Sequence, residues 1–239
     1  MSDDFTITTE YRPEYKKKSI RTFVIRSGRM TESQAKAFDT YWKQVGLSLF
    51  DGPIDPPALF GRQAPLVIEI GFGMGDSLVD MAAADPDSDF IGIEVHPPGV
   101  GRLINRVGTE GVNNLKTYMA DANDVLEDCI ADGSVARVQL YFPDPWHKKK
   151  HHKRRIVQPE FVAQLVRKLQ PGGKIHMATD WAHYAEQMLE VLSANTDISN
   201  DSPAGDYVAK PAWRPHTKFE ARGERLGHGV WDLLFTKLG

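Results

Sequence analysis

The stretch Leu66-Val67-Ile68-Glu69-Ile70-Gly71-Phe72-Gly73-Met74-Gly75 joins an apolar run of strand length to a turn with three alternating glycines. Glycine adopts a positive φ without steric cost and lets a backbone approach a ligand closely. Helical periodicity follows directly, over 76–84. A strand, a glycine turn and a helix in this order indicate the ligand-binding end of an α/β sheet.

The glycine turn alone is compatible with a purely structural role and with a dinucleotide-binding dehydrogenase. In the dehydrogenases a helix N-terminus receives a pyrophosphate. Here Gly75 is followed by Asp76, whose negative charge would repel that group. The pattern therefore argues against NAD as the ligand.

Apolar runs and helical patterns alternate through the rest of the chain, which implies a parallel sheet covered by helices on both faces. Residues 31–239 are expected to form a single domain after a flexible basic arm, 1–30, and Thr31-Glu32-Ser33-Gln34 resembles a capping box. Residues 52–57 are expected to form a linker, and 170–173 a turn. We expect strands at 66–70, 90–95, 115–119, 135–142, 174–178, near Lys218 and at 230–235, and helices at 31–42, 76–84, 99–110, 122–130, 160–169 and 182–194.

The composition is that of an ordinary globular protein: 239 residues, 41% hydrophobic and 26% charged. Cys129 is the only cysteine, which excludes an internal disulfide and a cysteine-rich metal cluster. No apolar stretch reaches membrane-spanning length, and the N-terminus lacks the apolar core of a signal peptide. A soluble, cytoplasmic protein is expected.

The net charge of −3 conceals a strong asymmetry along the chain. Basic residues gather in 12–29 and 148–155 and, more sparsely, in 210–225, whereas acids dominate 76–128. A fold that brings the basic segments to one side would present a positive face to phosphates. The charge pattern is therefore compatible with a nucleic-acid partner.

Three acids lie at or near the ends of successive predicted strands: Glu69, Glu94 and Asp121. The carboxyl ends of parallel strands meet at one edge of a sheet, where ligands bind. Such an acidic crevice suits a ligand with ribose, adenine and a positive charge but no phosphate. S-adenosylmethionine, a sulfonium compound, meets that description.

The stretch 138–155 ends an apolar strand in Asp144 and Trp146 and continues into dense positive charge. Asp144 can read or stabilise a base, Trp146 can stack on it, and the cations that follow can hold a polyanion. Together they indicate chemistry on a nucleobase. The simpler interpretation is a strand, a proline turn and a solvated charged loop. The histidines of this run have no accompanying acid or cysteine cluster, so no metal is expected.

Five motifs together resemble the bacterial tRNA (guanine-N7)-methyltransferases. The resemblance covers the chain from about Arg21 to its C-terminus, and the ordered set is more specific than any single motif. The motifs are Glu69–Gly75, Ile93–His96, Pro143–Lys148, Ala178–Trp181 and Thr217–Glu220.

The resemblance implies a class I methyltransferase fold, Rossmann-like, with a seven-stranded, mostly parallel sheet whose last strand is antiparallel. It implies methyl transfer from S-adenosylmethionine to N7 of a guanosine in the tRNA variable loop, forming 7-methylguanosine. We expect a monomer with tRNA as partner and neither membrane nor metal. By motif position the cofactor would be bound by Glu69, Gly71, Gly73, Glu94, Asp121 and Asp144, with Asp144 also catalytic; the substrate would be bound by Lys148, Asp180, Thr217, Lys218, Phe219 and Glu220; and RNA would contact Lys149, Lys150, Lys153, Arg154 and Arg155.

Two alternatives stay open at this point. Pro143-Asp144-Pro145-Trp146 is similar to the Asp/Asn-Pro-Pro-aromatic motif of methyltransferases that act on exocyclic amines of adenine or cytosine. A non-catalytic RNA-binding protein that keeps the fold is the other. The intact set of Glu69, Glu94 and Asp121 weighs against the second alternative.

Overall fold

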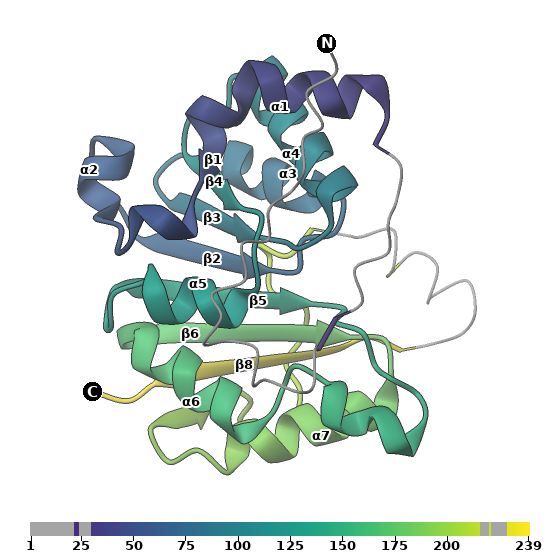
Figure 1. The fold of residues 1–239 in the computed structure, drawn as a ribbon. Helices are drawn as coiled ribbons and strands as arrows, with labels where there is room; N and C mark the ends of the chain where they lie inside the picture. Colours follow the sequence, from purple (N-terminus) through teal and green to yellow (C-terminus); the bar gives the residue numbers. More distant parts are fainter. Residues whose placement is uncertain (1–21, 24–29, 216–219, 221–228) are drawn as a thin grey trace.

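An eight-stranded sheet organises the chain in the computed structural model, which describes residues 22–23, 30–215, 220 and 229–239 (Figure 1). The sheet has the order β1-β4-β3-β2-β5-β6-β8-β7. Only β8 runs antiparallel to the other strands, pairing with β6 on one side and β7 on the other. The strands are β1 (Gly46–Leu47), β2 (Leu66–Ile70), β3 (Asp89–Ile93), β4 (Leu115–Tyr118), β5 (Val135–Tyr141), β6 (Leu169–Thr179), β7 (Ile198–Asn200) and β8 (Trp231–Lys237).

Helices cover both faces of the sheet, as the alternating sequence pattern predicts. One apolar cluster joins α1, α3 and α4 to β2, β3 and β4, and the other joins α5, α6 and α7 to the central strands. The helices are α1 (Glu32–Val45), α2 (Pro56–Phe60), α3 (Asp76–Ala84), α4 (Pro97–Glu110), α5 (Ala122–Asp128), α6 (Pro159–Lys168) and α7 (Ala182–Ser193), with short 3-10 turns η2 (Leu49–Asp51) and η3 (Lys149–Arg154).

The α/β class and mostly parallel sheet are confirmed, and the predicted bounds of β2 and α3 agree with the structure. The capping box is also present: Thr31 Oγ1 accepts from the Gln34 amide at 3.3 Å, and Gln34 Oε1 accepts from the Thr31 amide at 2.8 Å. This reciprocal pair fixes the start of α1 because it satisfies two amides that have no intrahelical partner.

The prediction of seven strands is wrong, because β1 and β7 add short pairings that have too few residues for a readable alternation. The predicted linker at 52–57 is interrupted by α2, which begins at Pro56. The turn at 170–173 lies inside β6, where Gly172 has a φ of 75° and the pairing with β5 shifts register between Val135 and Arg137. The strand expected near Lys218 lies outside the described residues, as does most of the arm 1–30.

Candidate functional site

The carboxyl ends of the parallel strands bring the predicted acids to one edge of the sheet. Glu69 is the penultimate residue of β2, Glu94 directly follows β3, and Asp121 caps α5 after β4. Asp144 follows β5, and Asp180 follows β6. The strands β4, β3, β2, β5 and β6 are consecutive neighbours in the sheet (Figure 1). The five acids therefore lie in one row along the carboxyl ends of these strands.

The glycine-rich turn faces open space. Gly71, Gly73 and Gly75 have φ of 73°, 59° and 75°, a conformation that strains other residues. A Cβ at Gly71 or Gly73 would meet nothing within 4 Å, whereas one at Gly75 would lie 2.7 Å from Leu103 Cβ. The first two glycines therefore leave room for a ligand, and the third permits close packing against α4.

Asp76, the first residue of α3, is held by arginines of α4. Its Oδ1 accepts from Arg102 Nε at 2.8 Å and lies 3.7 Å from Arg106 Nη1. The negative charge at this helix start is thus ion-paired. Repulsion of a pyrophosphate by Asp76 is therefore a weaker argument against NAD than the sequence alone suggested.

Glu94 ties the glycine turn to the end of β3. Its Oε2 accepts from the Gly73 amide at 2.9 Å, and its Oε1 accepts from the amides of Val95 at 2.7 Å and His96 at 3.0 Å. Burial raises the pKa of Glu94, and these three hydrogen bonds offset part of that rise. The carboxylate is therefore fixed in orientation at the end of β3, next to the glycine turn.

Glu69 is a buried acid in an apolar strand. Burial, and secondarily the charge of Glu94, raise the pKa of Glu69 to about 8, so its carboxyl is mostly protonated at neutral pH. Its Oε2 has no hydrogen-bond partner among the described residues. A buried carboxyl oxygen without a partner is costly, and a ligand that donates to it would remove that cost.

Asp121 is oriented by the start of α5. Its Oδ1 accepts from the Asn123 amide at 2.9 Å and from Asn123 Nδ2 at 3.0 Å, a normal helix N-cap. The side chain is half-buried beside the same strand ends. A capping role and a ligand role are compatible, because a carboxylate has several acceptor positions.

The strand tip that carries Asp144 has an unusual backbone. Phe142 and Trp146 have φ of 52° and 45°, on either side of the exposed Asp144. A left-handed conformation in a bulky residue costs of order 1–3 kcal/mol and persists only where the surroundings impose it. The tip is therefore held in a fixed, strained shape, as is common at functional sites.

Aromatic and cationic side chains surround this tip. Arg154 Cζ lies 4.2 Å from the Trp146 ring centroid, and the His147 and Trp181 rings meet edge to face at 4.3 Å. Trp146 Nε1 donates to the Thr22 carbonyl at 3.2 Å, which brings a short piece of the N-terminal arm to the same place. Trp146 is thus held by a cation over its ring and by a hydrogen bond from its ring nitrogen.

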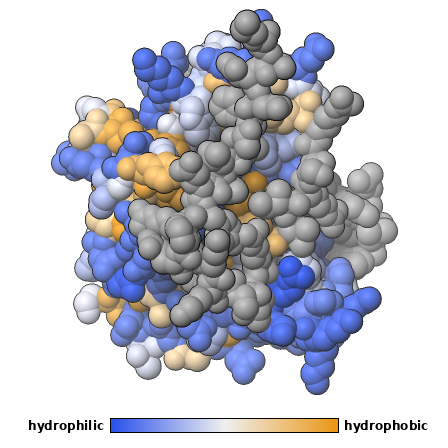
Figure 2. Space-filling model, in the orientation of Figure 1, coloured by the Kyte–Doolittle hydropathy of each residue, from blue (hydrophilic) through white to orange (hydrophobic). Residues whose placement is uncertain are grey.

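The basic run divides into exposed and buried members. Lys148, Lys149, Lys150 and Lys153 are exposed on and beside η3. Figure 2 shows hydrophilic side chains gathered at the lower right of this face, near α7 in Figure 1. The four lysines thus present their positive charges to solvent.

Arg155, predicted as an RNA contact, is buried at 2% exposure, unlike the exposed lysines of the same run. Its Nε donates to the Pro145 carbonyl at 2.7 Å, its Nη1 donates to Gln187 Oε1 at 2.5 Å, and its guanidinium lies 4.6 Å from the Tyr184 ring centroid. Arg155 instead anchors the strand tip to α7. The sequence alone could not show that Arg155 is buried, because nothing in a run of cationic residues distinguishes a buried member from an exposed one.

The structure describes only three of the six predicted substrate residues. Lys148 and Asp180 lie at the strand-end edge, whereas Thr217, Lys218 and Phe219 lie outside the described residues. Glu220 is buried and accepts two hydrogen bonds from Arg214. Within the described residues, no group of three or more His, Cys, Asp or Glu could hold a metal ion.

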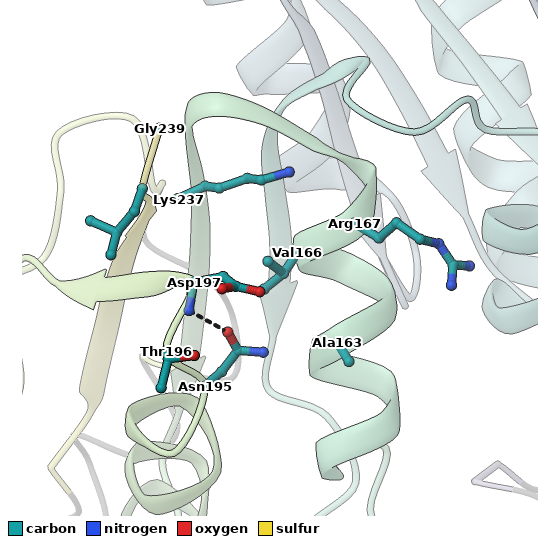
Figure 3. Close-up of a pocket in the computed structure, with 9 residues that line it drawn as sticks. Ala163, Val166, Arg167, Asn195, Thr196, Asp197, Lys237 and Gly239 are labelled. Atoms are coloured by element: carbon teal, nitrogen blue, oxygen red, sulfur yellow. Dashed lines mark hydrogen bonds between the residues drawn. The ribbon is translucent and has the colours of Figure 1, made fainter.

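A separate pocket lies at the opposite edge of the sheet, between α6, the chain before β7 and the C-terminus (Figure 3). In it the Asp197 amide donates to Asn195 Oδ1 at 2.9 Å. It is lined by Ala163, Val166, Arg167, Asn195, Thr196, Asp197, Lys237, Leu238 and Gly239, none of which was predicted as a site residue.

Sequence comparisons with known proteins identify methyltransferases as relatives of this chain. Residues 63–233 match a family model described as "Putative methyltransferase". The tRNA (guanine-N(7)-)-methyltransferase of Saccharophagus degradans is 70% identical over 95% of this chain and 99% of its own length. The chain belongs to the bacterial tRNA (guanine-N7)-methyltransferase family. Another member of the family, from Alcanivorax borkumensis, is 60% identical over 92% of each chain.

Solved structures support the methyltransferase fold. An aminoglycoside resistance methyltransferase superposes with a TM-score of 0.51 at 17% identity, covering 92% of this chain and 98% of its own. A 16S rRNA (adenine(1408)-N(1))-methyltransferase of Catenulisporales acidiphilia gives a TM-score of 0.52 at 13% identity, covering 78% and 92%. The class I, Rossmann-like methyltransferase fold expected from the motifs is thereby confirmed.

Proposed function

We propose that this protein transfers a methyl group from S-adenosylmethionine to N7 of a guanosine in the variable loop of tRNA. One observation carries the proposal. The Asp144 strand tip follows β5, next to β2 and its glycine turn in the sheet, in a sequence 70% identical to a tRNA (guanine-N(7)-)-methyltransferase. The variable loop comes from the motif resemblance and is the finer part of the proposal.

The residues at the strand ends fit this cofactor. Gly71 and Gly73 leave space for its bulk, and Glu94 presents a fixed carboxylate for ribose hydroxyls. Near the turn, Glu69 offers a buried oxygen that no described residue hydrogen-bonds, suited to a cationic donor. Asp121 and Asp144 would complete the row of acids. S-adenosylmethionine, when bound, supplies an electrophilic methyl group on a sulfonium.

Guanine N7 has an in-plane lone pair and no proton, so it can attack a methyl group without a general base. The protein must then orient the base and stabilise the positive charge that develops on it. The exposed Asp144 carboxylate, on a strained and therefore rigid tip, suits both tasks. We assign it the role of base reader and electrostatic stabiliser.

The exposed lysines beside the tip would bind the tRNA backbone. Lys149, Lys150 and Lys153 follow Asp144 within one short segment, so phosphates bound there bring nucleotides to the site. Such contacts position RNA without reading sequence. Arg154, which lies over Trp146, would join them at the edge of the base site. Lys148, nearer to the tip, would contact the substrate guanosine.

A direct assay tests this function. Purified protein is incubated with methyl-labelled S-adenosylmethionine and unmodified tRNA transcript, and the digested nucleosides are separated. Label in 7-methylguanosine supports the proposal, and label in a methylated exocyclic amine supports the amino-methyltransferase alternative. Cofactor and tRNA binding without label supports a non-catalytic RNA-binding protein.

We also propose that residues 31–239 act as one domain, as a monomer in the cytoplasm where tRNA is found. Support for the single domain comes from one sheet that contains every strand of the described residues, with β1 and β7 at its edges. No helix among the described residues is long and apolar enough to cross a membrane. Size-exclusion chromatography with light scattering would measure the oligomeric state.

A further inference from the structure

A cluster of buried polar side chains lies on one face of the sheet behind the candidate site. His176 of β6 and Asp232 of β8 are 0% and 3% exposed. Their strand neighbours Met177 and Leu233 belong to the apolar cluster with α5, α6 and α7, so His176 and Asp232 point to the opposite face. Arg214, from the chain between β7 and β8, is buried against them at 2% exposure.

Arg214 bridges two buried carboxylates. Its Nε donates to Asp232 Oδ1 at 2.7 Å, and its Nη2 donates to Asp232 Oδ2 at 2.8 Å. On the other side, its Nη1 donates to Glu220 Oε2 at 2.8 Å and its Nη2 to Glu220 Oε1 at 3.1 Å. Both contacts are bidentate, which a planar guanidinium allows and an ammonium does not.

His176 is fixed beneath this bridge in one tautomer. Trp213 Nε1, which can only donate, lies 3.0 Å from His176 Nδ1, so Nδ1 is the acceptor and the ring proton is on Nε2. His176 Nε2 then donates to Asp232 Oδ1 at 2.7 Å. Burial lowers the pKa of His176, which agrees with a neutral ring. Asp232 is thus held from two sides.

The cluster also touches the strand tip that carries Asp144. The Tyr141 hydroxyl lies 2.8 Å from His176 Nδ1, and Arg214 Cζ lies 5.7 Å from the Phe142 ring centroid. Tyr141 ends β5, and Phe142 is the residue with positive φ that starts the tip. Arg214 therefore contacts Phe142 and Glu220 at once.

We propose that Arg214 is a positioning residue for methyl transfer, anchored by Asp232 and His176, which joins Glu220 to the Asp144 strand tip. Through Arg214, the buried Glu220 carboxylate is held at a fixed place relative to the tip. The inference rests on the proposed function, because it assigns a role within that reaction.

The Arg214 bridge can affect methyl transfer without touching the substrate, by fixing the position of the Asp144 strand tip. Small displacements of a reacting base lower the rate steeply while leaving the binding of distant parts unchanged. The lysines near Asp144 and the acids around the glycine turn do not belong to the cluster. Removal of the bridge should therefore lower turnover and spare the affinities for cofactor and tRNA.

Two variants test the bridge. Arg214→Lys keeps the charge but removes the bidentate geometry. Trp213→Phe removes the indole donor to His176 Nδ1 and leaves the Tyr141 hydroxyl 2.8 Å from that nitrogen, so it is a milder change. With saturating tRNA and cofactor, we expect Arg214→Lys to lower kcat by about tenfold or more, since 1.4 kcal/mol of lost transition-state stabilisation corresponds to tenfold. We expect a smaller loss of kcat for Trp213→Phe. Cofactor Kd by calorimetry and tRNA Kd by fluorescence anisotropy should stay within about twofold of the wild type.

Asp89→Asn is the matched control. Asp89 is buried at 1% exposure and accepts from Arg62 Nη2 at 2.7 Å, but it starts β3 at the far edge of the sheet. The Asp89→Asn substitution should lower the melting temperature without changing kcat. Unchanged kcat in both bridge variants, an equal loss of kcat in Asp89→Asn, or a parallel loss of cofactor affinity would each overturn the inference. A wild-type protein that forms no 7-methylguanosine would instead refute the proposed function.

Discussion

Gly99, in the first turn of α4, packs directly against the backbone carbonyl of Gly73 in the glycine-rich turn, so that a Cβ at Gly99 would overlap the carbonyl oxygen. The amide of Gly73 meanwhile donates to Glu94 at 2.9 Å. The backbone of Gly73 is therefore clamped between a strand-end carboxylate and a helix. The shape of the proposed cofactor site depends on a glycine outside the turn itself.

Substitution of Gly99 by alanine should weaken cofactor binding. The added methyl group must displace Gly73, whose backbone cannot yield as a flexible side chain could. We expect the Kd of S-adenosylmethionine, measured by calorimetry, to rise by about tenfold or more, which corresponds to 1.4 kcal/mol. Gly101→Ala in the same helix is the control, since its Cβ would press on Gln34 and Phe38 of α1 instead. Equal effects of the two variants on Kd would contradict the prediction.

Glu69 should make stability depend on pH. Its pKa is raised from 4.5 to about 8 in the folded protein, so the folded state keeps a proton that the unfolded state releases. Stability should therefore fall as pH rises from about 4.5 to about 8 and level off above that range. Glu69→Gln should abolish this fall and gain stability relative to the wild type as pH increases.

Urea unfolding at pH 5 and pH 8 measures the difference, with the exposed Glu190→Gln as control. A cationic ligand should favour the ionised form of Glu69, so cofactor binding at pH 7 should release up to about one proton. Calorimetry in buffers of different ionisation enthalpy counts that proton. The same pH dependence in Glu69→Gln and in the wild type would assign it to other groups.

Asp144→Asn should separate turnover from cofactor binding. The amide keeps the shape of the side chain but loses the charge that favours a positively charged purine, so kcat should fall by about 100-fold, as for loss of one electrostatic stabiliser. The Kd of S-adenosylmethionine should change little. Asp39→Asn, an exposed residue of α1, is the matched control. An equal loss in kcat and cofactor affinity would refute the assigned role.

The lysines and Arg155 should respond differently to substitution. Lys149→Ala and Lys153→Ala should weaken tRNA binding and reduce the salt dependence of log K by about 0.7–0.9 for each phosphate that is no longer neutralised. Arg155→Ala should instead lower the melting temperature, because the Pro145 carbonyl and Gln187 Oε1 lose the hydrogen bonds that Arg155 donates. Titrations at several salt concentrations and thermal unfolding distinguish the two classes. A stable Arg155→Ala protein with a reduced salt slope would restore Arg155 as an RNA-binding residue.

Local patterns in the sequence determined most of the regular elements. β2 and α3 were bounded correctly because an apolar run, glycines and a helical period follow one another without ambiguity. The gathering of Glu69, Glu94 and Asp121 at one edge also followed, since parallel strands end on the same side. Short strands such as β1, which has two residues, are too short to show an alternation of apolar and polar residues, so the sequence did not predict them.

The sequence by itself determined the fold class, the row of strand-end acids and the family. Only the tertiary structure decided which charged residues are buried. Arg155 and Arg214 look like surface cations in the sequence, but both are enclosed by partners far along the chain. Burial and hydrogen bonding of a charged side chain depend on what packs over it, and contacts between distant segments have no local signature in the sequence.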